Sequence, residues 1–193
     1  ATTGVVWGAD DWPMHLHDAE RSGFSDTLIE LPLSQHWLHV SASAPEAAWA
    51  PPIPHAVEGN LEINRLDFDL AFQVAASAEA VYFGSSSDDQ VRCLDSRSGK
   101  VRWSFFADGP VRLGPSLDAG RLYFGSDDGF VYCLDAESGS VIWKRLLGFD
   151  RTRHLGNGRL ISRWPVRSGI LIRDGIAYCG AGVFPHEGII LCA

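Results

Sequence analysis

The sequence predicts an all-β fold assembled from repeated four-stranded antiparallel sheets, and three observations lead to this prediction. First, the stretch from Leu94 to Trp103 recurs from Leu134 to Trp143, at an offset of 40. Second, the segments between the turns are rich in Val, Tyr, Phe, Ile and Trp, which favour strands. Third, each turn carries Asp and Gly. These residues suit tight hairpins, because Gly accepts positive φ and the Asp side chain caps the turn.

The repeat extends well beyond this stretch. The strand signal at 81–85 returns at 122–126 with an offset of 41, because the first copy carries one extra hairpin residue. A third copy begins at Pro165, which matches Pro110 at an offset of 55. It stops at Ala193, before the next residues of the repeat. A period of about 40 residues is typical of propeller blades or solenoid turns.

Each unit contains four expected strands. In the second copy they cover residues 111–117, 121–126, 130–135 and 140–146. These strands lack a clean alternation of polar and apolar residues, as Leu122, Tyr123 and Phe124 illustrate. Both faces of the sheet are therefore expected to be buried. Sheets stacked face to face around an axis bury both faces, which predicts a β-propeller with four-stranded antiparallel blades.

The repeated stretch resembles the tryptophan-docking motif of propellers built from pyrroloquinoline-quinone-type (PQQ-like) repeats, including outer-membrane assembly lipoproteins. The motif residues are Asp95, Gly99, Trp103, Asp135, Gly139 and Trp143. The second copy departs from the motif at one position, where Ser140 replaces a lysine. The resemblance implies that each Trp docks flat between adjacent blades, where a small residue such as Cys93 or Cys133 leaves room. The Asp residues open turns, so we expect them to accept backbone N–H bonds.

The repeat also predicts the domain organisation. Residues 68–193 are expected to form the blades, with repeats at about 69–109, 110–164 and 165–193. Residues 1–67 are expected to form a leader, in which residues 34–40 are the candidate strand that completes the last blade of the ring. Closed propellers have about four to eight blades. We therefore expect an incomplete portion, about three to four blades of a seven- or eight-bladed ring, completed by missing sequence or by another chain.

Composition excludes several classes of protein. The net charge of -8 argues against duplex nucleic acid as a partner, because phosphate binding depends on a cationic surface. No run approaches the ~18 apolar residues of a transmembrane segment. The chain begins at Ala1 without a charged and apolar leader, which is consistent with a processed periplasmic or secreted protein. The cysteines lie inside expected strands and are predicted to be free, buried thiols: Cys93, Cys133, Cys179 and Cys192.

Two departures from the repeat mark a candidate binding surface. Pro165 follows Trp143 by 22 residues, whereas Pro110 follows Trp103 by seven. The linker after Trp143 therefore carries an insertion. Residues 144–173 hold eight of the 16 basic residues and one acid. The hairpin from 180 to 191 is also longer, with 11 steps instead of six. In a propeller these two loops lie on the same face, and binding residues concentrate on such loops.

The candidate residues of this surface are Arg151, Arg153, His154, Arg159, Arg163, Arg167, Phe184 and His186. A protein partner is expected there, through an acidic patch or another anionic group. The alternative is that the arginines pair with acids of neighbouring hairpins as solvated ion pairs of little net energy. Those acids are Asp88, Asp89, Asp127 and Asp128.

The sequence predicts no catalytic, cofactor-binding or metal-ligating residue. Quinone-dependent alcohol dehydrogenases of the resembled class would require a calcium-binding cluster, a catalytic Asp, a stacking Trp and often adjacent cysteines. None of these is recognisable in the sequence. The expected function is therefore a non-catalytic scaffold for protein–protein interaction or assembly in the periplasm or cell exterior. The alternative is the propeller part of a quinone-dependent dehydrogenase, or of an electron-transfer protein that works with a cytochrome, with PQQ and calcium as its cofactors.

Overall fold

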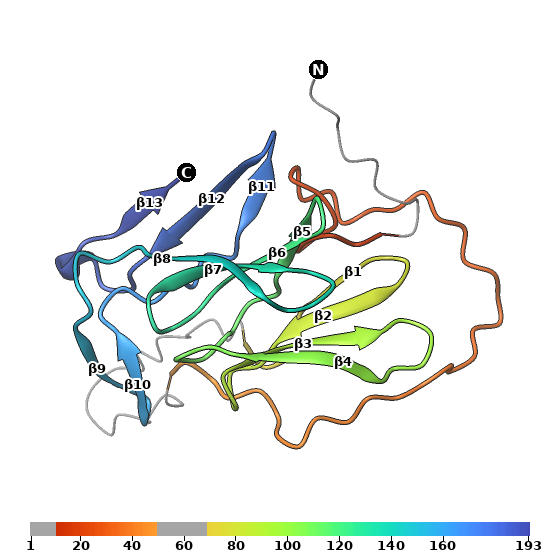
Figure 1. Cartoon of the computed structure of the whole chain (residues 1–193), viewed down its shortest axis with the longest axis horizontal. Helices are drawn as coiled ribbons and strands as arrows, with labels where there is room; N and C mark the ends of the chain where they lie inside the picture. Colours follow the sequence, from red (N-terminus) through yellow and green to blue (C-terminus); the bar gives the residue numbers. More distant parts are fainter. Residues whose placement is uncertain (1–10, 50–68) are drawn as a thin grey trace, which may run out of the picture.

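The computed structural model describes residues 11–49 and 69–193, and it confirms an all-β propeller architecture (Figure 1). Blade 1 consists of β1 (Val74–Ala76), β2 (Ala80–Gly84), β3 (Gln90–Asp95) and β4 (Val101–Phe106). Blade 2 consists of β5 (Ser116–Asp118), β6 (Arg121–Gly125), β7 (Phe130–Asp135) and β8 (Val141–Leu146). Blade 3 has three strands, β11 (Leu171–Arg173), β12 (Ile176–Ala181) and β13 (Ile190–Cys192). A separate hairpin pairs β9 (Arg153–Gly156) with β10 (Arg159–Ser162), and a 3-10 helix, η1, covers Pro185–Glu187.

The blades are antiparallel sheets whose strands follow the chain order. Blades 1 and 2 share one register, because Cys93 pairs with Trp103 as Cys133 pairs with Trp143. The register shifts directly after each cysteine. The first strand of blade 2, β5, contacts both β1 and β11, so the inner strands lie side by side while the outer strands fan apart (Figure 1). This is the radial arrangement that the repeat predicts.

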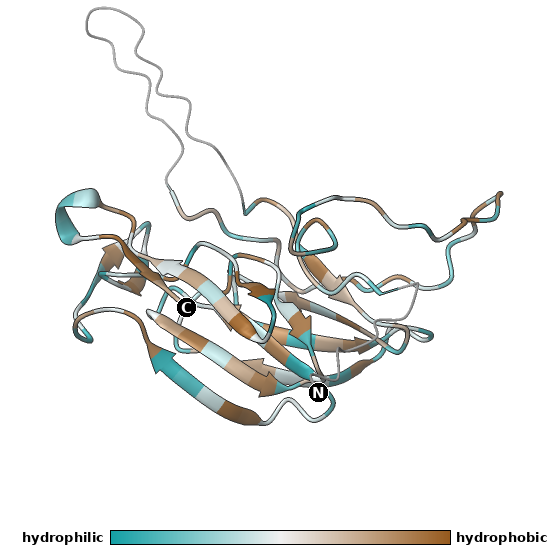
Figure 2. Cartoon of the chain, turned by 90° about the horizontal axis from the view of Figure 1, so that it is seen from above, coloured by the Kyte–Doolittle hydropathy of each residue, from teal (hydrophilic) through white to brown (hydrophobic). Residues whose placement is uncertain are grey.

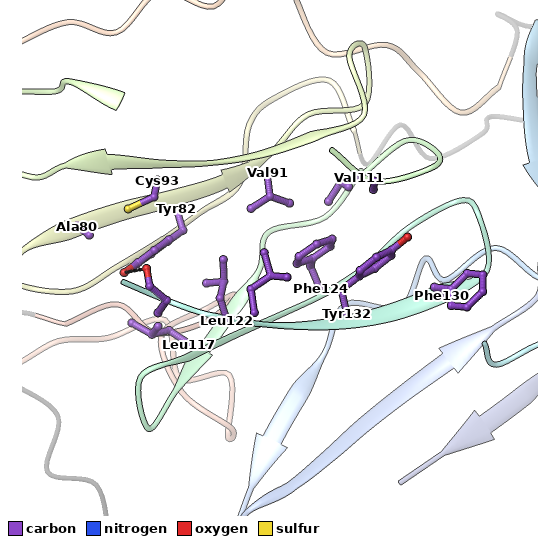
Figure 3. Packing of buried hydrophobic residues seen from close by; sticks show 13 residues of the cluster. Ala80, Tyr82, Val91, Cys93, Val111, Leu117, Leu122, Phe124, Phe130 and Tyr132 are labelled. Atoms are coloured by element: carbon purple, nitrogen blue, oxygen red, sulfur yellow. Dashed lines mark hydrogen bonds between the residues drawn. The ribbon is translucent and has the colours of Figure 1, made fainter. Parts of the chain in front are cut away.

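The main hydrophobic core lies between blades 1 and 2 (Figure 3). Tyr82 and Val91 of blade 1 face Leu122, Phe124 and Tyr132 of blade 2. The rings of Phe124 and Tyr132 stack with centroids 5.0 Å apart. Burial of one such side chain stabilises the fold by about 1.5–3 kcal/mol. Hydrophobic stretches, drawn in brown, recur along the strands of the sheets (Figure 2).

A second core lies between blades 2 and 3. Tyr123 and Val131 point from blade 2 toward Val166, Ile170 and Ile172. Both faces of blade 2 are therefore covered, and five of the six residues of β7 are buried. This confirms the prediction, made from the unbroken apolar pattern, that both faces of the sheet are buried.

The tryptophan-docking motif forms at the seam between blades 1 and 2. The Trp103 indole N–H donates to the carbonyl oxygen of Ala136 at 3.1 Å. The ring lies against Gly139, where a Cβ would approach it to 2.7 Å, and Gly139 has a φ of 72° that favours glycine. Asp135 accepts a bond from the backbone N–H of Ser138 at 2.8 Å, as its turn role requires.

Two sequence expectations need correction. The strand expected at 111–117 is reduced to β5 at 116–118. Pro115 explains part of this, because proline has no N–H to donate to a sheet. All four cysteines are free, as predicted, but only Cys93 and Cys133 are buried. Cys179 and Cys192 are half-buried, because no described strand covers the outer edge of blade 3.

Residues 11–49 contact the blades without forming a sheet of their own. Trp12 exchanges backbone hydrogen bonds of 2.8 Å with Ala76 of β1, which extends the inner edge of blade 1. Residues 34–40 are not assigned to a strand. The division into a 1–67 leader and 68–193 blades stays a prediction, because residues 1–10 and 50–68 lie outside the described residues. No helix in the described part of the chain is long and apolar enough to span a membrane.

Candidate functional site

The insertion after blade 2 folds into the β9–β10 hairpin. Its turn is Asn157-Gly158, and both residues have positive φ, 47° and 79°. This is the type I′ arrangement whose backbone twist matches that of the flanking strands. The Asn-Gly pair between Leu155 and Leu160 is the sequence signal that could have predicted this hairpin.

The two enlarged loops contact each other, as the repeat predicts for loops on one face. The Trp164 indole N–H, within the insertion, donates to the carbonyl oxygen of Glu187 at 2.8 Å. The Arg163 guanidinium lies 3.0 Å from the Glu187 carboxylate. The rings of His154 and Phe184 have centroids 6.5 Å apart. Three contacts of different kinds thus join the insertion to the loop that follows β12.

A cavity of about 250 Å³ lies between these loops. Its walls include four of the eight predicted surface residues, His154, Arg163, Arg167 and Phe184. Sequence reasoning missed the aromatic residue on its other side, Trp49, whose ring centroid lies 6.4 Å from that of Phe184. Most of the remaining lining is apolar or small: Ala48, Leu155, Gly156, Ile161, Pro165 and Val183.

The arginines around the cavity already have acidic partners. Arg159 contacts both Glu46, at 2.9 Å, and Asp89. Burial opposes the charge of Arg159, but Glu46 and Asp89 outweigh it and raise the pKa of this guanidinium. Arg167 lies 2.6 Å from Asp127. The arginines that reach the cavity and its neighbourhood are therefore neutralised inside the protein, which favours the internal-pairing interpretation for them.

The other predicted surface residues lie away from the cavity wall. Arg151 is exposed and its guanidinium lies 5.8 Å from the centre of the Phe130 ring. Arg153 is exposed on β9. His186 is exposed in η1, with its Nε2 3.5 Å from Glu187. Arg153 and His186 adjoin the wall, because Arg153 precedes His154 in the chain and the His186 ring lies 5.6 Å from that of Phe184.

A buried ion-pair network lies beneath the cavity. Asp127 accepts from Arg112 at 2.7 Å and from Arg167 at 2.6 Å. Arg112 also lies 2.6 Å from Asp69. Two guanidinium and two carboxylate groups thus balance, and all four side chains are at least nine-tenths buried. Sequence reasoning missed Arg112 and Asp69.

This burial corrects one part of the alternative interpretation. That interpretation placed Asp127 and Asp128 in solvated ion pairs, yet their side chains are buried, with 0% and 3% exposed. Asp128 accepts bonds from the hydroxyl of Tyr132 and the backbone N–H of Phe130. Burial raises the pKa of the Asp128 carboxyl, although these hydrogen bonds act in the opposite direction. The hairpin acids of blade 2 therefore belong to the interior.

A second hollow, of about 420 Å³, lies beside the hairpin turns at Asp118 and Asp174. Its lining also includes Asp11, Asp18 and Asp26. Across residues 11–49 and 69–193, no three His, Cys, Asp or Glu side chains gather closely enough to hold a metal ion.

The chain is similar to one protein family in sequence and to several solved structures in fold. A protein-family model described as outer membrane protein assembly factor BamB matches residues 46–161. The quinohemoprotein alcohol dehydrogenase of Comamonas testosteroni aligns with 89% of this chain at 17% identity and a TM-score of 0.61. Quinohemoprotein alcohol dehydrogenase ADHIIG of Pseudomonas putida HK5 aligns with 90% at 18% identity and a TM-score of 0.56.

BamB from Moraxella catarrhalis aligns with 58% of the chain at 22% identity and a TM-score of 0.45. The chain spans only part of these proteins, 30% of the BamB structure and 23% of each dehydrogenase. None of the curated proteins compared with the chain matches it. At these identities the two dehydrogenase structures show a shared fold and nothing more.

Proposed function

The chain belongs to the family described as outer membrane protein assembly factor BamB, and we propose that it is a non-catalytic propeller scaffold that binds a protein partner. Its place of action, in this proposal, is the periplasm or the cell exterior. The observation that carries the proposal is the cavity between the β9–β10 hairpin and the Val183-Phe184 loop. This cavity combines aromatic walls with arginines that are already neutralised.

The lining supports an apolar or aromatic anchor from the partner. Trp49 and Phe184 offer ring faces, and Arg167 holds its guanidinium 5.3 Å from the Trp49 ring centre. An anionic ligand would have to compete with Asp127 for Arg167 and with Glu187 for Arg163. An aromatic side chain needs no such exchange, and aromatic anchors in pockets dominate many protein interfaces.

The rim supports the same conclusion. Arg153 and His186 are exposed and adjoin the lining residues His154 and Phe184. Protein interfaces commonly place polar, solvated residues around an apolar centre. The rim residues are thus suited to orient a partner whose anchor fills the cavity.

The proposal is tested with a peptide-display library selected against the whole chain. Labelled selected peptides are then titrated against the wild type and against Phe184→Ala by fluorescence anisotropy. Loss of an anchoring ring is expected to weaken binding about 30-fold, which corresponds to roughly 2 kcal/mol. The matched control is Tyr178→Ala, an aromatic residue of similar exposure on the same blade but outside the cavity. Equal losses in the two variants would contradict the proposal.

The alternative function is the propeller part of a quinone-dependent dehydrogenase or of an electron-transfer protein. The two dehydrogenase structures share the fold over 89% and 90% of the chain, so this alternative needs its own test. Absorbance and native mass spectrometry of protein purified with quinone and calcium present distinguish the two functions. A stoichiometric bound quinone would overturn the scaffold proposal, whereas peptide binding without quinone would support it.

A further inference from the structure

Blade 3 carries two cysteines at directly opposed positions of neighbouring strands (Figure 1). Cys179 of β12 pairs with Cys192 of β13 in an antiparallel register, and both thiols are free and half-buried. Residues opposed in this way lie on the same face of the sheet, with their Cα atoms about 4.5–5.5 Å apart. A disulfide requires Cα atoms about 4.4–6.8 Å apart. The strand pairing therefore brings the two cysteines within disulfide range.

The other blades show that side chains at these two positions contact each other. The positions are the residue before the glycine of the second strand and its cross-strand partner. In blade 2 they hold Phe124 and Tyr132, whose rings stack with centroids 5.0 Å apart. In blade 1 they hold Phe83 and Arg92, and the guanidinium lies 6.0 Å from the ring centre. The repeat thus reserves these positions for a cross-strand contact, and blade 3 places two thiols there.

The surroundings of the four cysteines distinguish this pair from the other two. Cys179 packs against the core between blades 2 and 3. Burial raises the pKa of its thiol to about 11, and the neighbouring Cys192 acts in the same direction, as expected for two close sulfur atoms. Cys93 and Cys133 are each paired with a tryptophan across the strands. Neither of them faces another cysteine.

The cysteine pair stands at the base of the loop that forms one wall of the cavity. Residues 180–191 connect the two cysteines and include Val183 and Phe184, which line the cavity. They also include Glu187, whose carbonyl oxygen accepts the Trp164 indole N–H at 2.8 Å. The far end of this loop is anchored by β13, which pairs with β12 over only three residue pairs. A covalent link at the base would hold both ends of the loop.

We propose that Cys179 and Cys192 form a disulfide that fixes the 180–191 loop, and with it the Phe184 wall of the cavity. The oxidant is a disulfide, carried by a small molecule or by a protein. One cysteine thiolate attacks a sulfur atom of the oxidant and forms a mixed disulfide, which releases the first oxidant thiol. The second cysteine thiolate attacks the protein sulfur of the mixed disulfide and releases the other oxidant thiol. The two cysteines lose two electrons and two protons, and the oxidant disulfide is reduced to two thiols.

The link also has a consequence for binding. A loop that is held at both ends loses less conformational freedom when a ligand binds, so oxidation is expected to strengthen binding in the cavity. Disulfides persist in oxidising compartments such as the periplasm and the cell exterior. Both this effect and the occurrence of the link in the cell rest on the proposed function, whereas the reactivity of the purified chain does not.

The link is tested by treating the whole chain with oxidised glutathione, alkylating the remaining thiols and mapping the product by mass spectrometry. A link between Cys179 and Cys192 within one chain is expected, with Cys93 and Cys133 alkylated. The matched control combines Cys192→Ser with Leu191→Cys, which moves the thiol to the opposite face of β13. This variant is expected to form no link. A link between two chains, a glutathione adduct in place of the link, or equal linking in the control would overturn the proposal.

Thermal unfolding supplies an independent readout. The oxidised chain is expected to have a Tm roughly 5–10 °C above that of the reduced chain, because the link constrains the unfolded state. The Cys192→Ser variant is expected to show no such difference. Equal Tm values for the linked and the reduced wild type would overturn the proposal.

The peptide titration separates this proposal from the proposed function. Oxidation of the wild type is expected to tighten peptide binding about two- to tenfold. Phe184→Ala is expected to weaken binding in both redox states while it keeps the link and the shift in Tm. If the link forms but no selected peptide binds, the proposed function fails and the disulfide stands. Equal affinity of the linked and the reduced chain would overturn the effect on the cavity wall.

Discussion

Arg112 and Arg167 occupy the same position in successive repeats but have different surroundings. Arg112 is enclosed between Asp69 and Asp127 and is 5% exposed. Arg167 shares Asp127 but turns its other side toward Trp49 and the cavity. The repeat thus provides a buried arginine at the start of blade 2 and of blade 3. In blade 3 the enlarged loops make this arginine, Arg167, part of the cavity wall.

The largest expected effect comes from removing the acid that the two arginines share. Asp127→Asn leaves two buried guanidinium groups with a single carboxylate, and an unbalanced buried charge costs about 3–5 kcal/mol. Urea denaturation measures this loss in the free energy of unfolding. Asp108→Asn is the control, because the Lys144–Asp108 pair is exposed and 3.9 Å apart, and it is expected to cost about 0–1 kcal/mol. Similar losses in both variants would break the comparison.

The two arginines themselves are expected to differ. Arg112→Met leaves Asp69 without its cation and is expected to cost about 3 kcal/mol, because a buried charge stays uncompensated. Arg167→Met leaves Asp127 paired with Arg112 and is expected to cost about 1–2 kcal/mol less. Parallel denaturation curves measure the difference. In the peptide titration the order reverses, and only Arg167→Met is expected to weaken binding, since Arg112 does not line the cavity.

The smallest expected effect is a pH dependence of stability that comes from Asp128. Unlike its neighbour Asp127, Asp128 forms no ion pair in the described residues. Burial raises the pKa of Asp128 in the folded state above its ordinary value of 3.8. The folded state therefore holds this proton more tightly than the unfolded state, and stability is lost as the pH rises from 3.8 to the raised pKa. Asp128→Asn is expected to remove this slope. Urea midpoints measured across acidic pH test it, and an unchanged slope would assign it to other carboxyls.

The repeat predicted the blades well and the interior of the site poorly. The bounds of β7 match the expected residues 130–135, because a Gly precedes the strand and a turn-opening Asp ends it. The enlarged loops were predicted because their lengths differ from the corresponding loops of the other repeat copies. The Arg112–Asp69 pair was not predicted, because its two residues lie far apart in the sequence and only tertiary packing brings them together. Trp49 was missed for the same reason, since its region follows no repeat.

The close approach of consecutive blades explains how so long an insertion is tolerated. A Cβ on Gly84 would lie 2.4 Å from Val111, and one on Gly125 would lie 2.3 Å from Val166. The linker of seven residues places Val111 against Gly84, and the linker of 22 residues places Val166 against Gly125 in the same way. The same glycine–valine contact thus forms between blades 1 and 2 and between blades 2 and 3. The β9–β10 hairpin is an addition to this contact and does not replace it, although its own residues Ile161 and Ser162 are buried in the fold.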